Sequence, residues 1–340
     1  MSKKNSNVIL KEGFKRYEDL SFIYSTFKKK IGKFKKKLFL IAVSGGPDSL
    51  ALTALAKAYS YEYKCRIYYV LIDHNLRKNS SKEAQSVKKL LKKYKINLTI
   101  LKNKKSISRN IQSQARSVRY NLLTNFCKKK GVKTILTAHN LEDQVETFFI
   151  RLSRGSGLQG LSSMKQINKI NANISLMRPM LDFKKIQLIK ISKLVFGRYY
   201  KDPTNKDTKY LRTRIRNLKE SLEDSGINYD QINKSIKNLA SSRDTLDLYF
   251  NKIYQEIINK KKTQILINFN DFKILNNEMK MKILKQSIKD LSHLYYSPRS
   301  KKIFNLLEQI GRGKDINRSL GGCVIYREKN YIILKKDKKN

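Results

Sequence analysis

An apolar stretch that breaks into a glycine turn constrains the fold of this chain more than any other feature. Residues 38–43 read LFLIAV, residues 44–49 read SGGPDS, and residues 50–56 read LALTALA. The first run predicts a buried strand, and the last predicts a helix that begins at the turn. Glycines let the backbone approach a ligand closely, and the free N–H groups of a helix N-terminus attract anions. The stretch therefore predicts a strand, a phosphate-binding loop and a helix in direct succession.

Strand and helix patterns alternate through the first half of the chain, which is typical of a Rossmann-like, doubly wound parallel sheet. The further predicted strands are residues 67–72, 98–101 and 133–137, and the predicted helices are residues 15–30, 82–95 and 108–130. Ligands of such sheets bind beyond the carboxyl ends of the strands. The glycine turn, His74 and His139 each follow a predicted strand. We expect these three segments to meet in one crevice.

Three carboxylates begin the helix that is predicted to follow His139. Asp143 and Glu146 are three residues apart, and Glu142 and Glu146 are four apart, so these side chains project near the crevice. Acidic residues also stabilise a helix N-terminus without any ligand. The chain has only 27 acidic residues among 340, so three beside a phosphate site favour Mg²⁺ binding and contact with an activated group. Asp48, in the glycine turn, can hold a divalent cation against phosphate oxygens.

Two other phosphate motifs do not fit the sequence. No window supplies the Gly-x-x-x-x-Gly-Lys-Ser/Thr pattern of kinase-type loops. Residues 155–160 match Gly-x-Gly-x-x-Gly, but this pattern closes a predicted helix, whereas a dinucleotide fingerprint follows a strand. A glycine loop flanked by arginines is better suited to a polyanion or to a moving lid.

Composition limits the partners and the compartment. The net charge of +47 favours polyanionic partners, although an AT-rich coding background would enrich lysine in the same way. The three scattered cysteines form no Cys-x-x-Cys pair, which argues against a disulfide framework or structural zinc. We see no apolar run of about 18 residues and no secretory signal, so we expect a cytoplasmic protein without a membrane partner.

The chain changes character after residue 216, where it becomes rich in lysine and asparagine. We expect a first domain over residues 1–216 and a mainly helical domain with a small β hairpin over residues 217–340. The predicted helices of the second part are residues 217–260 and 277–292, and its strands are residues 265–269, 323–326 and 331–334. Basic turns at 297–302 and 311–314 fit an RNA-binding role, and His293 reads as structural or solvated.

The motifs together resemble the tRNA(Ile)-lysidine synthetase family, a tRNA-modifying branch of the PP-loop ATP pyrophosphatases. The family's Ser-Gly-Gly-x-Asp-Ser loop and its histidine after the second strand match Ser44, Gly45, Gly46, Pro47, Asp48, Ser49 and His74. Further matches lie at residues 114–120, 138–147, 154–161, 178–181, 202–205 and 212–216, so the resemblance covers about residues 35–220. Glu142 replaces the first Asp of the family's acidic pair, and Thr213 replaces an Asn of its arginine cluster.

The resemblance implies a two-step ligation that uses ATP and Mg²⁺. ATP adenylates O2 of the wobble cytidine in the CAU anticodon of tRNA(Ile) and releases diphosphate. The amine of free L-lysine then displaces AMP at C2, and decoding changes from AUG to AUA. The general base is left open between His139 and a carboxylate, and a monomer and a homodimer are both compatible with the resemblance.

The resemblance also implies roles for individual residues. Residues 44–49 and His74 would bind ATP, and Asp48 and Asp143 would hold Mg²⁺. The residues implied in catalysis are Asp48, His139, Asp143 and Glu146. The residues implied in binding of the substrate or tRNA are Arg116, Glu142, Arg178, Arg212, Arg214 and Arg216.

Three other functions fit less well. A PP-loop tRNA thiolase needs cysteines near the active site, and an amidotransferase-type synthetase should carry a glutaminase or matching substrate domain. A non-catalytic tRNA-binding protein on an inactive ATPase fold would not need an intact loop at residues 44–49 or Asp143. The sequence favours lysidine synthesis over all three.

Overall fold

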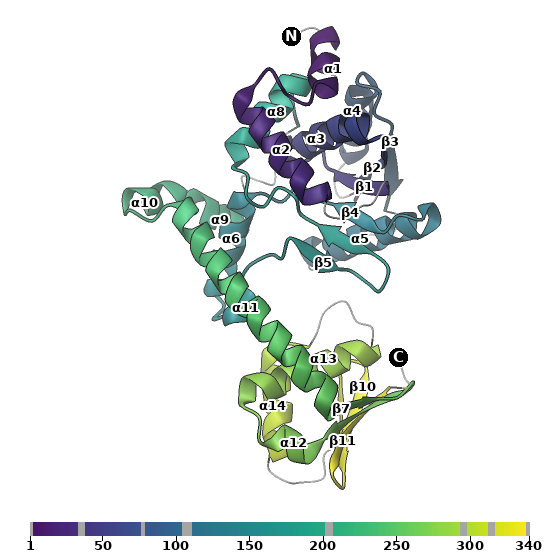
Figure 1. Cartoon of the computed structure of the whole chain (residues 1–340), viewed down its shortest axis with the longest axis vertical. Coiled ribbons are helices and arrows are strands. Elements are labelled where there is room, and N and C mark those ends of the chain that lie inside the picture. Colours follow the sequence, from purple (N-terminus) through teal and green to yellow (C-terminus); the bar gives the residue numbers. More distant parts are fainter. Residues whose placement is uncertain are drawn as a thin grey trace. The chain divides into compact units, whose positions relative to one another are not determined.

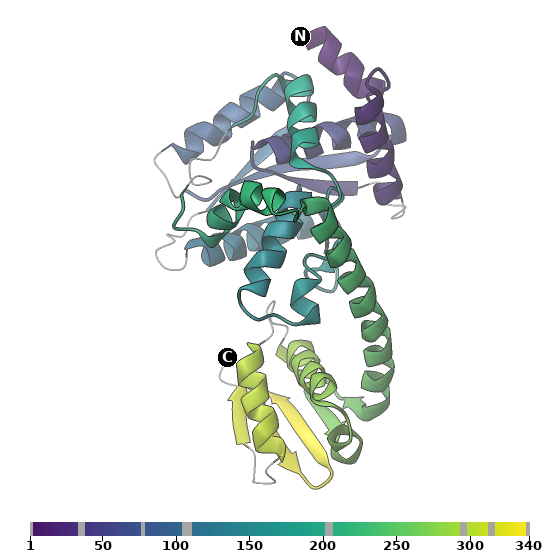
Figure 2. The same cartoon turned by 90° about the vertical axis from the view of Figure 1, so that its left-hand side faces the viewer.

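The computed structural model describes residues 3–32, 38–75, 79–103, 111–200, 207–292, 298–311 and 317–337 (Figures 1 and 2). Contacts divide the chain into two compact units, Met1–Ala240 and Ser241–Asn340. The sequence changes character at residue 217, whereas the contacts divide the chain later, inside helix α11 (Tyr229–Ile257). The reason is that Tyr229, Ile232 and Ile236 pack with Leu141 and Val145, which belong to the first unit.

The first unit contains a six-stranded sheet in the order β3-β2-β1-β4-β6-β5. Its strands are β1 (Leu38–Val43), β2 (Arg66–Asp73), β3 (Leu98–Lys102), β4 (Thr134–Leu136), β5 (Ile167–Lys169) and β6 (Ser175–Met177). All neighbours pair in parallel except β5, which runs antiparallel to β6. The predicted Rossmann-like sheet is therefore confirmed. Strands β5 and β6 have three residues each, so they are too short to show the alternating apolar pattern by which a strand is predicted.

Helices cover both faces of this sheet, as parallel sheets require. The helices of the first unit are α1 (Lys3–Lys11), α2 (Glu18–Gly32), α3 (Pro47–Tyr63), α4 (Ser80–Lys92), α5 (Ile111–Lys130), α6 (Leu141–Leu152), α7 (Leu158–Leu161), α8 (Lys185–Phe196), α9 (Leu211–Asn217), α10 (Lys219–Asp224) and the first part of α11. Alternate residues of β1 point to opposite faces of the sheet. Phe39 and Ile41 join the core beneath α3 and α8, whereas Leu40 joins the core beneath α5. Burial on both faces fixes β1 at the centre, and hence the position of the loop after it.

The second unit has its own sheet and core. Its antiparallel sheet has the order β7-β8-β11-β10-β9, with β7 (Ile258–Lys260), β8 (Gln264–Asn268), β9 (Asn317–Leu320), β10 (Cys323–Glu328) and β11 (Tyr331–Lys336). Its helices after α11 are α12 (Phe269–Lys273), α13 (Asn277–Ser292) and α14 (Ser300–Gly311). The predicted hairpin is confirmed as β10–β11, and it belongs to this larger sheet. The predicted helix 217–260 is interrupted at Gly226, whose φ is +83°.

Some sequence features lie outside the described residues. These are residues 202–205, His293 and parts of the basic turns at 297–302 and 311–314. Among the helices that the structure describes, none is both long and apolar enough to cross a membrane.

Candidate functional site

The loop between β1 and α3 is closed by its own serines. The backbone N–H and the hydroxyl of Ser44 both donate to Ser49 Oγ at 3.1 Å. The Ser49 hydroxyl donates in turn to the carbonyl of Gly46 at 3.0 Å. Pro47 occupies the first turn of α3, where its missing N–H costs nothing. The sequence thus builds a rigid turn at a helix N-terminus, which is the arrangement that binds phosphate.

Gly45 cannot be replaced without strain, because its φ is +84°. A Cβ atom at this position would lie 2.6 Å from Val87 Cγ2 of α4. The carbonyl of Gly45 also accepts a hydrogen bond from the backbone N–H of Tyr200 at 3.0 Å. The loop is therefore held from outside by two further segments.

Asp48 lies in the first turn of α3, and its Oδ1 atom is buried without a hydrogen-bond partner among the described residues. Burial raises the pKa of Asp48 to about 6, and the nearby Asp143 and Glu142 carboxylates contribute to the rise. The Lys185 ammonium and the Asn140 side chain oppose it. Asp48 thus shares one electrostatic environment with the start of α6.

The start of α6 is fixed by a reciprocal cap. Asn140 Oδ1 accepts from the N–H of Asp143 at 2.9 Å, and Asp143 Oδ2 accepts from the N–H of Asn140 at 3.1 Å. Glu142 Oε2 accepts from the N–H of Lys185 at 2.9 Å, so it caps the first turn of α8. Three helix N-termini, those of α3, α6 and α8, are consequently linked through Asp48, Asp143 and Glu142.

Glu146 lies one turn further along α6, and its side chain is 2% exposed. Its Oε1 atom accepts from Arg216 Nε at 2.8 Å, and its Oε2 atom accepts from Arg216 Nη2 at 3.2 Å. Arg212 Nε lies 3.1 Å from the same Oε2. Burial raises the pKa of Glu146 even though these guanidiniums favour its charged form. The two arginines therefore pair α9 with the buried face of α6.

We expect the two histidines predicted for the site to be neutral at pH 7, because the pKa of each is lowered. Burial lowers the pKa of His139 to about 4, and Arg178, Arg116 and Arg212 add to the effect. His139 Nδ1 lies 3.0 Å from the hydroxyl of Thr137. Burial, together with Arg119, lowers the pKa of His74 to about 4. Arg119 Nη2 lies 3.4 Å from His74 Nε2, so Nδ1 carries the His74 proton when that guanidinium donates.

The remaining predicted arginines differ in burial. Arg178 is buried, and its guanidinium donates to the carbonyl of Lys165 at 2.8 Å. Arg116 is exposed, with its guanidinium 5.1 Å from the centre of the Tyr120 ring. Arg214 is exposed between the buried Thr213 and Ile215. Arg214 is thus directed to solvent, whereas Arg178 holds a loop.

The glycine pattern at residues 155–160 begins just after helix α6 and ends inside the short helix α7. Arg151 holds the segment by donating to the carbonyls of Gly160 at 2.7 Å and Ser163 at 2.9 Å. A dinucleotide fingerprint would follow a strand, so this context agrees with our rejection of that interpretation.

Comparison with known proteins supports what the loop indicates. A family model described as a PP-loop domain matches residues 21–221. A tRNA(Ile)-lysidine synthase of Wolbachia pipientis wMel is 33% identical over 86% of this chain and 69% of its own length. The chain belongs to the tRNA(Ile)-lysidine synthase family. Another relative, the tRNA(Ile)-lysidine synthase of Orientia tsutsugamushi (strain Boryong), is 39% identical over 64% of this chain and 49% of its own length.

A solved structure shares the fold of this tRNA(Ile)-lysidine synthase family member. It is the U34-tRNA thiolase NcsA from Methanococcus maripaludis, with a TM-score of 0.54 and 16% sequence identity. The match covers 64% of this chain and 76% of the thiolase. At this identity the likeness shows the PP-loop fold alone, which is that of an ATP-using enzyme family.

The fold brings together most residues that the sequence predicts for a tRNA(Ile)-lysidine synthase site. Contacts or charge interactions join Asp48, His139, Glu142, Asp143, Glu146, Arg212 and Arg216. The roles assigned to these residues stay predictions. Two further residues of the site were not predicted. Asn140 caps α6, and an Asn before Leu-Glu-Asp is a recognisable cap signal. Lys185 faces Asp48, and no sequence signal indicates it because it comes from a distant helix.

The residues present fit a divalent cation that is completed by phosphate. Among the described residues, no group of three or more His, Cys, Asp or Glu side chains could hold a metal ion by itself. Mg²⁺ usually takes one or two carboxylates together with phosphate oxygens and water. The buried, unpartnered Oδ1 of Asp48 beside Asp143 matches that requirement.

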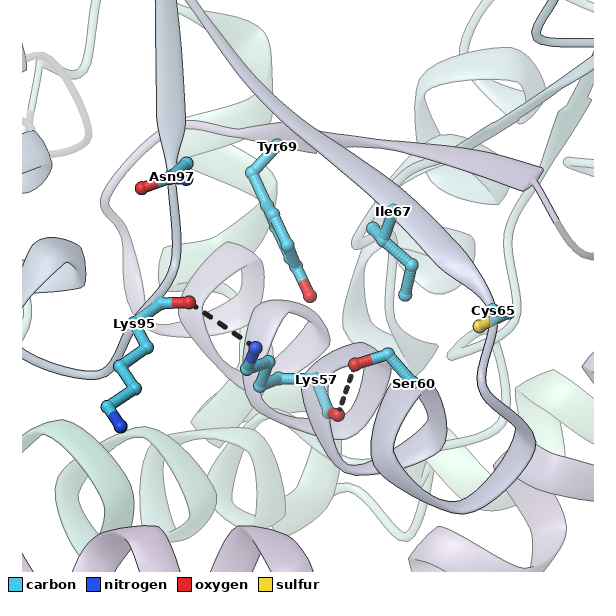
Figure 3. Close-up of a pocket in the computed structure, with 7 residues that line it drawn as sticks. All are labelled: Lys57, Ser60, Cys65, Ile67, Tyr69, Lys95 and Asn97. Atoms are coloured by element: carbon cyan, nitrogen blue, oxygen red, sulfur yellow. Dashed lines mark hydrogen bonds between the residues drawn. The ribbon is translucent and has the colours of Figure 1, made fainter.

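A separate cavity of about 190 Å³ lies away from this site (Figure 3). Its lining includes Lys57 and Ser60 from the second half of α3, and Cys65 just before β2. Figure 3 shows the Tyr69 ring extending toward Lys57. This polar hollow lies toward the amino end of β2, whereas the glycine loop lies at the carboxyl edge of the sheet.

Proposed function

We propose that this chain joins L-lysine to C2 of the wobble cytidine of tRNA(Ile) bearing the CAU anticodon, at the expense of ATP. The observation that carries the proposal is the buried, unpartnered Asp48 oxygen in a PP-loop, beside the capped Asp143. Family membership supports the reaction, because the relatives are named tRNA(Ile)-lysidine synthase.

In the first step the cytidine O2 attacks the α-phosphorus of ATP and diphosphate leaves. The N–H groups at the α3 N-terminus would face the developing negative charge. Asp48 and Asp143 would hold Mg²⁺, which supplies charge neutralisation at the phosphate oxygens when bound. His74 follows β2 at the same edge of the sheet and would contact ATP there.

In the second step the amine of lysine attacks C2 and AMP leaves. Asp143 and Glu146 would orient the ammonium group before it is deprotonated. His139 is the general base that we favour, since it is neutral at pH 7 and borders Asp143. When its Nδ1–H donates to Thr137, the Nε2 atom is left to accept the proton.

The arginines would bind RNA phosphates. Arg214 is exposed on α9, and Arg212 and Arg216 flank it along the same short helix. Guanidinium groups bind phosphate oxygens in a forked geometry. A cytoplasmic location stays a prediction. The oligomeric state is open between a monomer and a homodimer, and sedimentation equilibrium distinguishes the two.

The reaction is tested by incubating the purified chain with ATP, labelled lysine and separate tRNA transcripts. We expect labelled RNA, AMP and diphosphate in equal amounts with tRNA(Ile) bearing CAU. A methionine tRNA with the same anticodon is the matched control and should stay unlabelled. Formation of ADP, or no label in any RNA, would contradict the proposal.

A further inference from the structure

Both oxygens of Glu146 are engaged by arginines in the RNA-free chain. Arg216 bonds Oε1 at 2.8 Å and Oε2 at 3.2 Å, and Arg212 approaches Oε2 at 3.1 Å. The side chain of Glu146 is 2% exposed, so solvent scarcely reaches it. A carboxylate that is buried and paired in this way has no oxygen accessible to another cation.

The two guanidiniums face solvent on their other side. The side chain of Arg212 is 44% exposed, and that of Arg216 is 33% exposed. They are four residues apart in α9, so they lie on one face of the helix. Each guanidinium therefore contacts the buried Glu146 carboxylate and is also partly exposed. A polyanion at the surface can compete with Glu146 for the guanidinium. Phosphate can compete with Glu146 because, like a carboxylate, it accepts two N–H groups of a guanidinium at once.

We propose that Arg212 and Arg216 close the Glu146 carboxylate to the lysine amine until RNA phosphates draw the two guanidiniums away. This inference rests on the proposed function, in which Glu146 orients the substrate ammonium. Removing the cationic partner of a buried carboxylate is strongly unfavourable. An ammonium that replaces the guanidiniums compensates that loss. Lysine binding and RNA binding consequently favour each other.

The coupling is measured on the wild-type chain by equilibrium dialysis with labelled L-lysine. The chain is loaded with α,β-methylene ATP, which prevents turnover, and is compared with and without an anticodon stem–loop bearing CAU. We expect RNA to tighten lysine binding about tenfold or more, and lysine to tighten RNA binding by the same factor. Equal lysine affinity with and without RNA would overturn the inference.

Variants test which side chains are responsible. Arg216→Gln and the double variant with Arg212→Gln should raise the lysine affinity of the RNA-free chain and bring the coupling factor toward one. Lys209→Gln is the matched control, because it removes an exposed cation just before α9 and should keep the coupling. A folded Arg216→Gln chain, checked by circular dichroism, that gains no lysine affinity would contradict the gate. Should the variants not fold, the wild-type comparison still decides.

A further variant separates this inference from the proposed function. Glu146→Gln should abolish lysine binding to the RNA complex. If it does so while wild-type lysine affinity is insensitive to RNA, the function stands and the gate fails. If Glu146→Gln binds lysine like the wild type, the role of Glu146 fails, and the inference fails with it.

Discussion

At the scale of single residues, burial of the Asp48 carboxylate disfavours its charged form. Its carboxylate enters the first turn of a helix, where the dipole favours negative charge, yet its pKa rises to about 6. Desolvation therefore outweighs the helix terminus and the nearby Lys185. Burying an acid in this way is unfavourable for folding and useful for binding a cation, because the site gains most when positive charge arrives.

Replacing Asp48 by Asn should stabilise the ligand-free chain at pH 7 and abolish diphosphate release. The folded pKa of about 6 exceeds the ordinary 3.8, so this group favours folding below pH 4 and loses that contribution as pH rises through 6. Removing the charge should therefore gain about 1–3 kcal/mol at pH 7 and little at pH 4. Thermal unfolding at both pH values measures this.

The control for this measurement is Asp224→Asn, at an exposed residue in α10. It should change the unfolding midpoint little at either pH. A lower midpoint for Asp48→Asn than for the wild type at pH 7 would show that its charge does not oppose folding.

At the scale of elements, the sequence predicts the helices and strands that have a long hydrophobic pattern or clear turn residues at their ends. The core strands, the start of α3 and the hairpin β10–β11 follow from apolar runs and turn residues. Strands β5 and β6, with three residues each, have no readable period, and α8 was not predicted at all. The loop and the α6 carboxylates are local motifs and could be predicted. Lys185 and the pairing of Glu146 with α9 depend on tertiary contacts, which no local pattern contains.

The cap of α6 gives a prediction at this scale. Asn140→Ala removes the side chain that holds Asp143 in place, so we expect a loss of about 1 kcal/mol in the free energy of unfolding. The turnover should fall more than tenfold, because Asp143 loses its orientation. Urea unfolding and the rate of diphosphate release measure the two effects. Asn140→Ser, which keeps a capping oxygen, should restore most of both, and an unimpaired Ala variant would disconnect the cap from turnover.

At the scale of the whole molecule, the basic charge is general, whereas the acidic cluster of the site is local. The net charge of +47 belongs to the entire sequence, whereas the acidic cluster occupies one edge of one sheet. In the proposed function a basic surface would gather RNA from solution, and the few carboxylates would define where the chemistry occurs. Each of the two units has a hydrophobic core of its own.

Salt should weaken tRNA binding steeply. Because phosphate contacts release counterions, we expect the affinity to fall about a hundredfold or more between 50 and 200 mM KCl. Arg214→Gln should make the slope of log affinity against log salt shallower by about one. Lys92→Gln, an exposed change at the end of α4, is the control and should leave the slope as it is. Filter binding over a salt series measures all three, and a flat wild-type profile would contradict a phosphate-based interface.

At the helix caps of the site, backbone N–H groups already bind some of the carboxylate oxygens that could contact a cation. Asp143 already gives Oδ2 to the N–H of Asn140, and Glu142 gives Oε2 to the N–H of Lys185. In the proposed function Asp143 would hold the cation, and its Oδ1 atom, which the cap does not use, is then suited to bind as a monodentate ligand. Calcium commonly takes both oxygens of a carboxylate and a larger coordination shell, whereas magnesium is satisfied by six single contacts in an octahedron. We therefore expect the cap on Asp143 to favour Mg²⁺ over the larger calcium ion at the proposed site.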